Sequence, residues 1–219
     1  MQELSTIQQI AIAILPVLLA ITVHEAAHGY VADRLGDKTA RLAGRVTLNP
    51  LKHIDPIGTI VLPLGMYVLT GFMFGWAKPV PVNWRNLGKP KRDSAIVAAA
   101  GPFSNFIMLL GWSLLLAFIP VVGQVSAWAA APLFHMATFG ILINAILMVL
   151  NLLPLLPLDG GRIVSSFLPA KIAYQYNKTE SWGFIILLVL LFTGLLGKIL
   201  TPAIQFFGGL GSSLARILW

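Results

Sequence analysis

The sequence predicts an all-α polytopic membrane protein: a bundle of about four to six transmembrane helices, with a short β-like or re-entrant segment after the first helix. Composition is the first reason, because 57% of the 219 residues are hydrophobic and only 11% are charged. Soluble domains carry about 25% charged residues. The second reason is that long apolar runs recur along the chain, with basic residues in the segments between them.

Four apolar runs define the helices that we expect to span the bilayer, because a spanning helix needs about 20 apolar residues. These runs cover residues 7–31, 94–119, 133–153 and 182–200. A weaker stretch, interrupted by glycines, covers residues 203–219. The sequence does not show whether this last stretch spans the membrane or lies on its surface.

A further apolar run, residues 57–76, is ambiguous. It contains Pro63 and several glycines, and both residue types interrupt regular helices. Strand-like pieces flank it at residues 44–48 and 80–82. These features suit a re-entrant loop, a hairpin or a broken helix as well as a full span.

The positions of the basic residues favour a re-entrant arrangement. If the run at 57–76 enters and leaves on one side, 13 of the 15 Lys and Arg residues lie on a single face, whereas a full crossing divides them 7 against 8. Cytoplasmic loops of membrane proteins carry an excess of Lys and Arg, so we expect the basic face to be cytoplasmic. The net charge of +7 is attributed to this bias and to anionic lipid headgroups rather than to nucleic acid.

We expect a single domain over residues 1–219, with a core at about 7–168 and C-terminal helices at about 181–219. The N-terminus lacks the basic start and cleavage site of a signal peptide, so it is expected to remain in the mature protein. Cysteine is absent, which excludes disulfides, thiol catalysis and thiolate ligands. Any metal must therefore be held by His and carboxylate side chains.

The motif His24-Glu-Ala-Ala-His28 lies within the first apolar run. Positions i and i+4 share one face of a helix, so both histidines can reach one metal ion. Glu25 then lies beside the metal and can take a proton from a bound water. The pattern is short, and its alternative reading is a pair of interfacial histidines. Ionisable residues within spans are rare, however, and usually mark function.

Asp159 is the strongest candidate for a third ligand, because a catalytic zinc takes three protein ligands and a water. Pro154 and Pro157 break the helix before it, and Gly160 and Gly161 permit tight backbone after it. Unwound backbone at membrane depth is tolerated where it is buried in protein or lines a cavity. The alternative reading is a capping Asp in a turn that ends a helix.

The positions of the candidate ligands relative to the basic face support the choice of Asp159. His28 precedes Arg34 by six residues, or about 9 Å along a helix, so the histidines lie near the basic end of the first helix. In the re-entrant arrangement the 133–153 helix also ends on the basic face, and Asp159 follows it. A full crossing of the run at 57–76 would separate the two sets of ligands.

Together these motifs resemble the site-2 protease family of intramembrane zinc metalloproteases. The resemblance rests on the His24 motif, on the segment from Asn151 through Pro157 to Asp159-Gly-Gly, and on Ala100-Gly-Pro-Phe-Ser-Asn105. Residues 44–58 and 75–82 also look like compact bacterial and archaeal members, and the similarity covers roughly residues 15–170. Larger members carry PDZ or nucleotide-sensing CBS modules, for which we expect no room here.

The resemblance assigns roles to individual residues. It implies that one Zn²⁺ per chain is held by His24, His28 and Asp159. It implies that Glu25 is the catalytic acid/base, and that Asn151 and Asn105 are polar groups near the substrate or the oxyanion.

The resemblance also implies an activity and a location. A single intramembrane metalloprotease domain would hydrolyse peptide bonds in or near transmembrane segments of membrane-anchored proteins, by zinc-activated water. The chain would lie in the cell membrane as a multi-pass protein, with its active site toward the cytoplasmic side. Its partners would be protein substrates and the lipid bilayer, with no nucleic acid.

Two other classes of function remain open. A zinc transporter or sensor would use the same ligands, but it predicts a second His and acid cluster inside the other helices, and the sequence has none. A catalytically inactive membrane chaperone predicts loss of Glu25 or of a ligand, and all are present. The sequence leaves open the substrate, the trigger, the oligomeric state and the choice among divalent metals.

Overall fold

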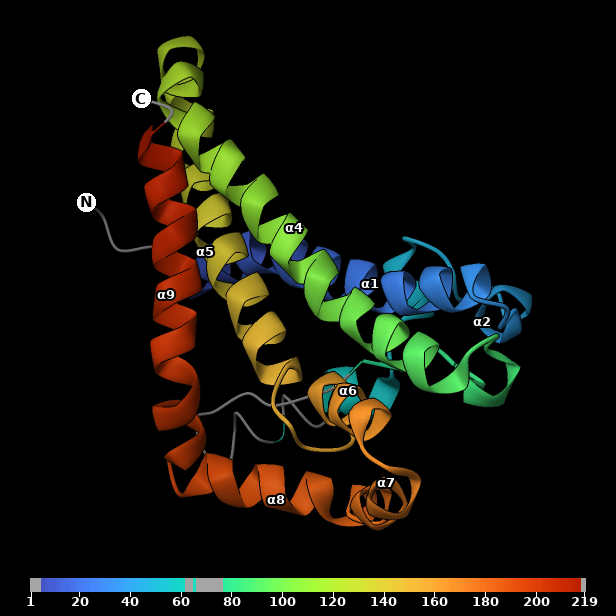
Figure 1. Cartoon of the computed structure of the whole chain (residues 1–219). Coiled ribbons are helices and arrows are strands. Elements are labelled where there is room, and N and C mark those ends of the chain that lie inside the picture. Colours follow the sequence, from blue (N-terminus) through green and yellow to red (C-terminus); the bar gives the residue numbers. More distant parts are fainter. Residues whose placement is uncertain (1–4, 62–64, 66–76, 218–219) are drawn as a thin grey trace.

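The computed structural model describes residues 5–61, 65 and 77–217, and the regular elements in these ranges are helices (Figure 1). Three of them are long and apolar enough to cross a membrane. They are α1 (Thr6–Arg34), α4 (Pro90–Val125) and α5 (Ala127–Asn151). The predicted all-α membrane fold is confirmed, with three candidate spans, or four if a bent C-terminal pair counts as one.

The C-terminal apolar residues form two helices, and the continuous span expected at residues 182–200 is wrong. α8 (Glu180–Phe192) and α9 (Leu195–Ile217) meet at an angle of 83°. Gly194 lies between them with a φ of 73°, a conformation that glycine adopts without steric cost. The turn falls inside the apolar run, so hydropathy alone does not reveal it.

α9 packs against α4 and α5 (Figure 1). Most of the stretch at 203–219, whose position the sequence did not determine, is therefore part of the helix bundle. Gly211 permits this approach, because a Cβ there would lie 2.7 Å from Ser113 Oγ and 3.0 Å from Ile141 Cγ2. Phe207 of α9 packs against the buried cluster that Leu109 and Ile141 form between α4 and α5. Gly211, one of the glycines that interrupt this apolar stretch, therefore has a role in helix packing.

α4 is the central helix, and it runs antiparallel to α1. His28 of α1 contacts Val97, near the start of α4, whereas Ala20 contacts Asn105 farther along. Gly88 N–H donates to Leu35 O at 3.1 Å, so the chain leaves α1 and enters α4 at one end of the bundle. This agrees with the re-entrant arrangement. Residues 62–64 and 66–76 of the ambiguous run lie outside the described residues.

The connection between α1 and α4 contains short helices. They are α2 (Thr39–Leu42), η1 (Pro50–Lys52), η2 (Pro56–Val61) and η3 (Trp84–Asn86). The strand-like character expected at residues 44–48 and 80–82 is wrong, because neither piece forms a β-strand. Backbone groups here bond elsewhere: Val80 N–H donates to the Glu25 carboxylate and Lys78 N–H to His53 O.

Asp37 fixes this connection to the end of α1. Its side chain is fully buried and accepts hydrogen bonds from Thr39 N at 3.1 Å, Asn83 N at 2.7 Å and Asn86 Nδ2 at 3.0 Å. Burial alone would raise the pKa of this carboxyl, but the Thr39 hydroxyl, which also donates to it, and these other donors outweigh burial and hold the pKa below its ordinary value. Asp37 is therefore a charged anchor outside the membrane-spanning segments.

Residues 120–132, which separate the apolar runs expected at 94–119 and 133–153, are almost entirely helical. α4 continues to Val125 and α5 begins at Ala127, with Pro120 and Pro132 inside the helices. Transmembrane helices tolerate internal proline because neighbouring groups satisfy the freed backbone. After α5 the chain unwinds over residues 152–158 and then forms α6 (Asp159–Phe167) and α7 (Ala170–Asn177).

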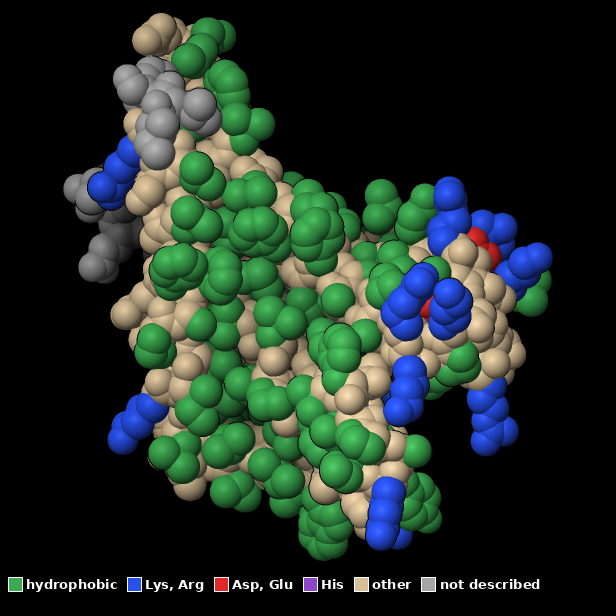
Figure 2. Space-filling view, viewed as in Figure 1, with side chains coloured by type: hydrophobic (Ala, Val, Ile, Leu, Met, Phe, Trp, Pro, Cys, Tyr) green, Lys and Arg blue, Asp and Glu red, His purple; other side chains and the backbone are tan. Residues whose placement is uncertain are grey.

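Hydrophobic side chains and basic side chains lie on different parts of the surface. Figure 2 shows hydrophobic side chains covering most of the face over α4, α5 and α9, and most Lys and Arg side chains gathered toward the end where α2 and the start of α4 lie. A bundle that enters lipid along its flanks needs such an apolar belt. The basic end is the one from which α4 begins.

α8 presses against the unwound segment that leads to Asp159. A Cβ on Gly183 would overlap Leu156 O and lie 3.0 Å from Pro157 Cδ. We expect Gly183→Ala to lower the melting temperature in detergent, because overpacking costs about 1–3 kcal/mol. Gly197→Ala is the matched control: nothing lies within 4 Å of a Cβ there. Equal melting temperatures for the two variants would contradict this packing.

Candidate metal centre

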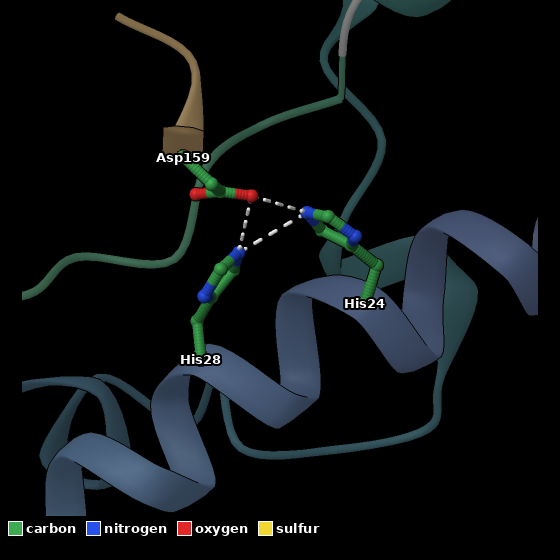
Figure 3. Close-up of side chains that lie close together, drawn as sticks. All are labelled: His24, His28 and Asp159. Carbon is green, nitrogen blue, oxygen red and sulfur yellow. Dashed lines mark hydrogen bonds and ion pairs between the residues drawn. The ribbon is translucent and has the colours of Figure 1, made fainter. Parts of the chain in front are cut away.

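Three potential ligands converge between α1 and the start of α6 (Figure 3). His24 and His28 project from adjacent turns of α1, and Asp159 is the first residue of α6. His24 Nε2 lies 3.3 Å and His28 Nε2 3.4 Å from Asp159 Oδ2. The two Nε2 atoms lie 3.1 Å apart. Both histidines are buried, with exposed fractions of 7% and 9%.

The proton on His28 is fixed by the backbone of α4. His28 Nδ1 lies 2.7 Å from Val97 O, and a carbonyl oxygen can only accept. Nδ1 therefore carries the proton, and Nε2 of the neutral ring presents a lone pair. Metal-binding histidines are commonly oriented by such a bond on the opposite nitrogen.

The proton on His24 is fixed by a chain of two buried amides. His24 Nδ1 lies 2.6 Å from Asn105 Oδ1, and Asn105 Nδ2 donates to Ala20 O and to Asn144 Oδ1. Asn144 Nδ2 in turn donates to Gly140 O. The carbonyl acceptors determine which way each amide points, so Nδ1 of His24 must be the donor. Both Asn side chains are fully buried.

The convergence of these atoms fits a bound cation. In the neutral rings both Nε2 atoms present lone pairs toward Asp159 Oδ2, which is itself buried without a hydrogen-bond partner. Tetrahedral zinc with bonds of about 2.0–2.1 Å places its ligand atoms about 3.3 Å apart. The observed separations of 3.1, 3.3 and 3.4 Å fit this geometry. Two imidazole nitrogens and one carboxylate oxygen are also a donor set that zinc accepts.

Gly101 gives the histidines their space. A Cβ at this position of α4 would lie 2.6 Å from His24 Nε2 and would overlap His28 Nε2. Real Cβ atoms do not come this close to a neighbour, so any side chain here would displace the nitrogen atoms. The glycine lies in the Ala100–Asn105 motif, but the sequence alone gave it no role.

Asp159 is held in place by the segments around α6. Gly160 and Gly161 lie so close to the backbone of residues 152–156 that a Cβ would overlap it. Arg162 donates to Glu180 of α8 at 2.8 Å, and its guanidinium lies 5.0 Å from the ring centre of Trp84. These contacts join α6 to α8 and to the segment before α4, so the carboxylate approaches the histidines from a fixed direction.

Glu25 is held by the connection between α1 and α4. Val80 N–H donates to Glu25 Oε2 at 2.7 Å, and the side chain is half-buried. A backbone N–H can only donate, so this bond orients the carboxylate of Glu25 toward the connection. The backbone that carries Val80 thus passes beside the helix that carries both histidines.

The two asparagines that the sequence indicated lie in different places and make different contacts. Asn105 contacts His24 and uses both of its polar atoms, so it lies behind a ligand. Asn151 is half-buried at the end of α5, where its Nδ2 donates to Leu147 O at 2.9 Å. Sequence reasoning missed Asn144. The signal that drew attention to Asn105, an amide within an apolar helix, applies equally to it.

Comparison with known proteins gives one family. The chain matches peptidase family M50 over residues 12–194. It is 40% identical to the zinc metalloprotease named YwhC of Bacillus subtilis, over 88% of this chain and 85% of that one.

More distant relatives are named as zinc metalloprotease Rip2. The chain is 31% identical to Rip2 of Mycolicibacterium smegmatis, over 83% of this chain and 66% of the relative. It is 28% identical to Rip2 of Mycobacterium tuberculosis, over 79% of this chain and 63% of the relative. It thus spans less than two thirds of the mycobacterial proteins. No solved structure matches the chain.

The match to the family covers far more than half of the chain, and it confirms the resemblance drawn from the motifs. The chain belongs to peptidase family M50, the site-2 protease family, and is a zinc metalloprotease.

Proposed function

We propose that this protein hydrolyses peptide bonds in or near the transmembrane segments of membrane-anchored proteins. We assign the zinc ligands to His24, His28 and Asp159, with one Zn²⁺ per chain, and the acid/base to Glu25. The observation that carries the proposal is the convergence of three ligand atoms, two of which lie on an apolar helix of membrane-spanning length. A site built on such a helix meets substrates that are themselves in the membrane.

The bound zinc, Glu25 and Val80 have different roles in the proposed reaction. Zinc held at the site supplies a Lewis acid toward the scissile carbonyl and lowers the pKa of a water. Glu25 accepts the proton of the attacking water and then donates it to the leaving amine. Val80 N–H keeps the Glu25 carboxylate oriented between these two transfers.

The two asparagines take different roles in this proposal. Asn105 holds His24 in the tautomer that leaves Nε2 unprotonated, since its own polar atoms are already engaged. Asn151 is the group that we assign to the oxyanion, as a polar side chain at the point where α5 ends and the chain turns toward Asp159. An amide donor at a developing oxyanion stabilises the transition state.

We propose a multi-pass location in the cell membrane, with the site toward the cytoplasmic side. The support is the shared end of α1 and α4, which places 13 of the 15 Lys and Arg residues in segments that begin and end on one side of the bundle. An excess of basic residues marks the cytoplasmic face. His28 lies six residues before Arg34, the last residue of α1.

A transporter or an inactive chaperone would share this metal site but not the chemistry. In the described part of the chain, this cluster is the only group of three or more His and acidic side chains whose ligand atoms lie close enough to share a metal ion. A transport path would need a second one. Cleavage by the purified protein separates the enzyme from both alternatives.

We expect Glu25→Gln to abolish cleavage and to retain zinc, because glutamine keeps the shape of the side chain but cannot accept the proton. Loss of a general base typically costs about 10²–10⁴-fold in rate. The measurement is cleavage of tagged single-span membrane proteins in detergent, together with zinc content by mass spectrometry. Glu3→Gln makes the same change outside the assigned site; it is the control and should cleave at the rate of the wild type. Full activity in Glu25→Gln would exclude the assigned role.

We expect Gly101→Ala to lose zinc, because the added methyl group occupies the space of both Nε2 atoms. Gly111→Ala lies in the same helix, nothing lies within 4 Å of a Cβ there, and it should bind zinc as the wild type does. A drop in zinc affinity of tenfold or more for Gly101→Ala alone is the expected result, measured by competition with a chelator. Equal zinc affinity in the two variants would show that the histidines do not bind zinc in this arrangement.

A further inference from the structure

A cavity of about 370 Å³ opens in the connection between α1 and α4. Its described lining includes three basic residues, Arg45, Lys52 and Lys78. These residues come from three separate pieces of the connection, after α2, at the end of η1 and before η3. The fold therefore gathers three positive charges around one space.

Arg45 is buried in the wall of this cavity, with only 7% of its surface exposed. Its Nη2 donates to Lys78 O at 2.7 Å and to Pro79 O at 3.4 Å, which orients the guanidinium. Its Nε is buried and has no hydrogen-bond partner. A buried charged donor without a partner is costly, so an acceptor that reached this guanidinium would stabilise it.

The described lining supplies no negative charge to these cations. It contains no Asp or Glu, and the part of the chain left undescribed between residues 61 and 77 has no acidic residue in its sequence. Asp55 is the nearest acid along the chain, and its Oδ1 accepts hydrogen bonds from Ile57 N and Gly58 N. The counter-charge must therefore come from outside the lining.

We propose that Arg45, Lys52 and Lys78 form a binding site for a phosphate group. A guanidinium held by two carbonyls presents a planar set of donors that matches phosphate oxygens, and lysines add charge without a fixed geometry. The cavity lies in the connection between α1 and α4, outside the candidate spans. The phosphate is supplied either by an anionic lipid headgroup or by a free phosphate in solution.

The site shares a wall with the segment that bonds the candidate acid/base. Arg45 binds the carbonyls of residues 78 and 79, and the next residue, Val80, donates to Glu25. The phosphate site is nevertheless distinct from the metal centre, because in the described chain its three basic residues form no hydrogen bond or ion pair with His24, His28 or Asp159. Its test needs no protease activity, so failure would leave the proposed function untouched.

The test compares the full chain with Lys52→Gln/Lys78→Gln, which removes two cations and leaves the bonds of Arg45 intact. Lys171→Gln/Lys178→Gln removes the same charge from exposed positions of α7 and its end and is the matched control. Melting temperature is followed during titration with phosphatidylglycerol or phosphatidylcholine in mixed micelles, and with inorganic phosphate against sodium chloride at equal ionic strength. Unchanged melting temperatures without ligand establish that each variant folds; Lys52→Gln alone replaces the double variant if it does not.

We expect phosphatidylglycerol or inorganic phosphate to stabilise the wild type and the control, and the Lys52/Lys78 variant to bind at least roughly tenfold more weakly, since each basic residue near an anionic surface contributes about a factor of five. A response to the lipid alone identifies a headgroup as the source, and a response to inorganic phosphate identifies a soluble phosphate. Equal affinity in the two double variants, or no response of the wild type to either ligand, would overturn the proposal.

Discussion

Three ligand atoms face one another between α1 and α6, and the surrounding packing holds them there. Val97 O and Asn105 Oδ1 occupy the far nitrogens of the two histidines, so in the neutral rings both near nitrogens are lone pairs beside the Asp159 carboxylate. A bound cation would neutralise the repulsion among these three acceptors. The hydrogen-bond geometry thus supports a metal site, in agreement with the family to which the chain belongs.

Close helix packing makes this geometry possible. α4 can approach the two histidines only because Gly101 has no side chain, and α6 can approach residues 152–156 only because Gly160 and Gly161 have none. A buried amide such as Asn105 is expensive unless its bonds are complete, and here Ala20, His24 and Asn144 complete them. The same contacts that stabilise the bundle thus fix the tautomer of a ligand.

The sequence predicted the long helices and the two histidines of the metal cluster because both depend on local spacing, whereas Asp159 was predicted from the Pro and Gly residues around it and from the family resemblance. Apolar length marks a span, and His24 and His28 share a helix face wherever that helix lies. Features that depend on the register between distant segments were not predictable. The bond between Asn105 and His24 requires α1 and α4 to be antiparallel at one particular offset. The turn at Gly194 lies within an apolar run, and the segment at residues 80–82 forms no strand because Val80 bonds a carboxylate instead.

The central claim is that two imidazoles and one carboxylate hold zinc at this site. X-ray absorption at the zinc edge of the purified protein tests it most directly, because the spectrum reports the ligand atoms and their distances. The account predicts bound zinc with two imidazole nitrogens and oxygen ligands at about 2.0–2.1 Å in a four-coordinate shell, and loss of one oxygen ligand or of the metal in Asp159→Ala. A well-folded protein without zinc, or a spectrum without imidazole that Asp159→Ala leaves unchanged, would contradict it.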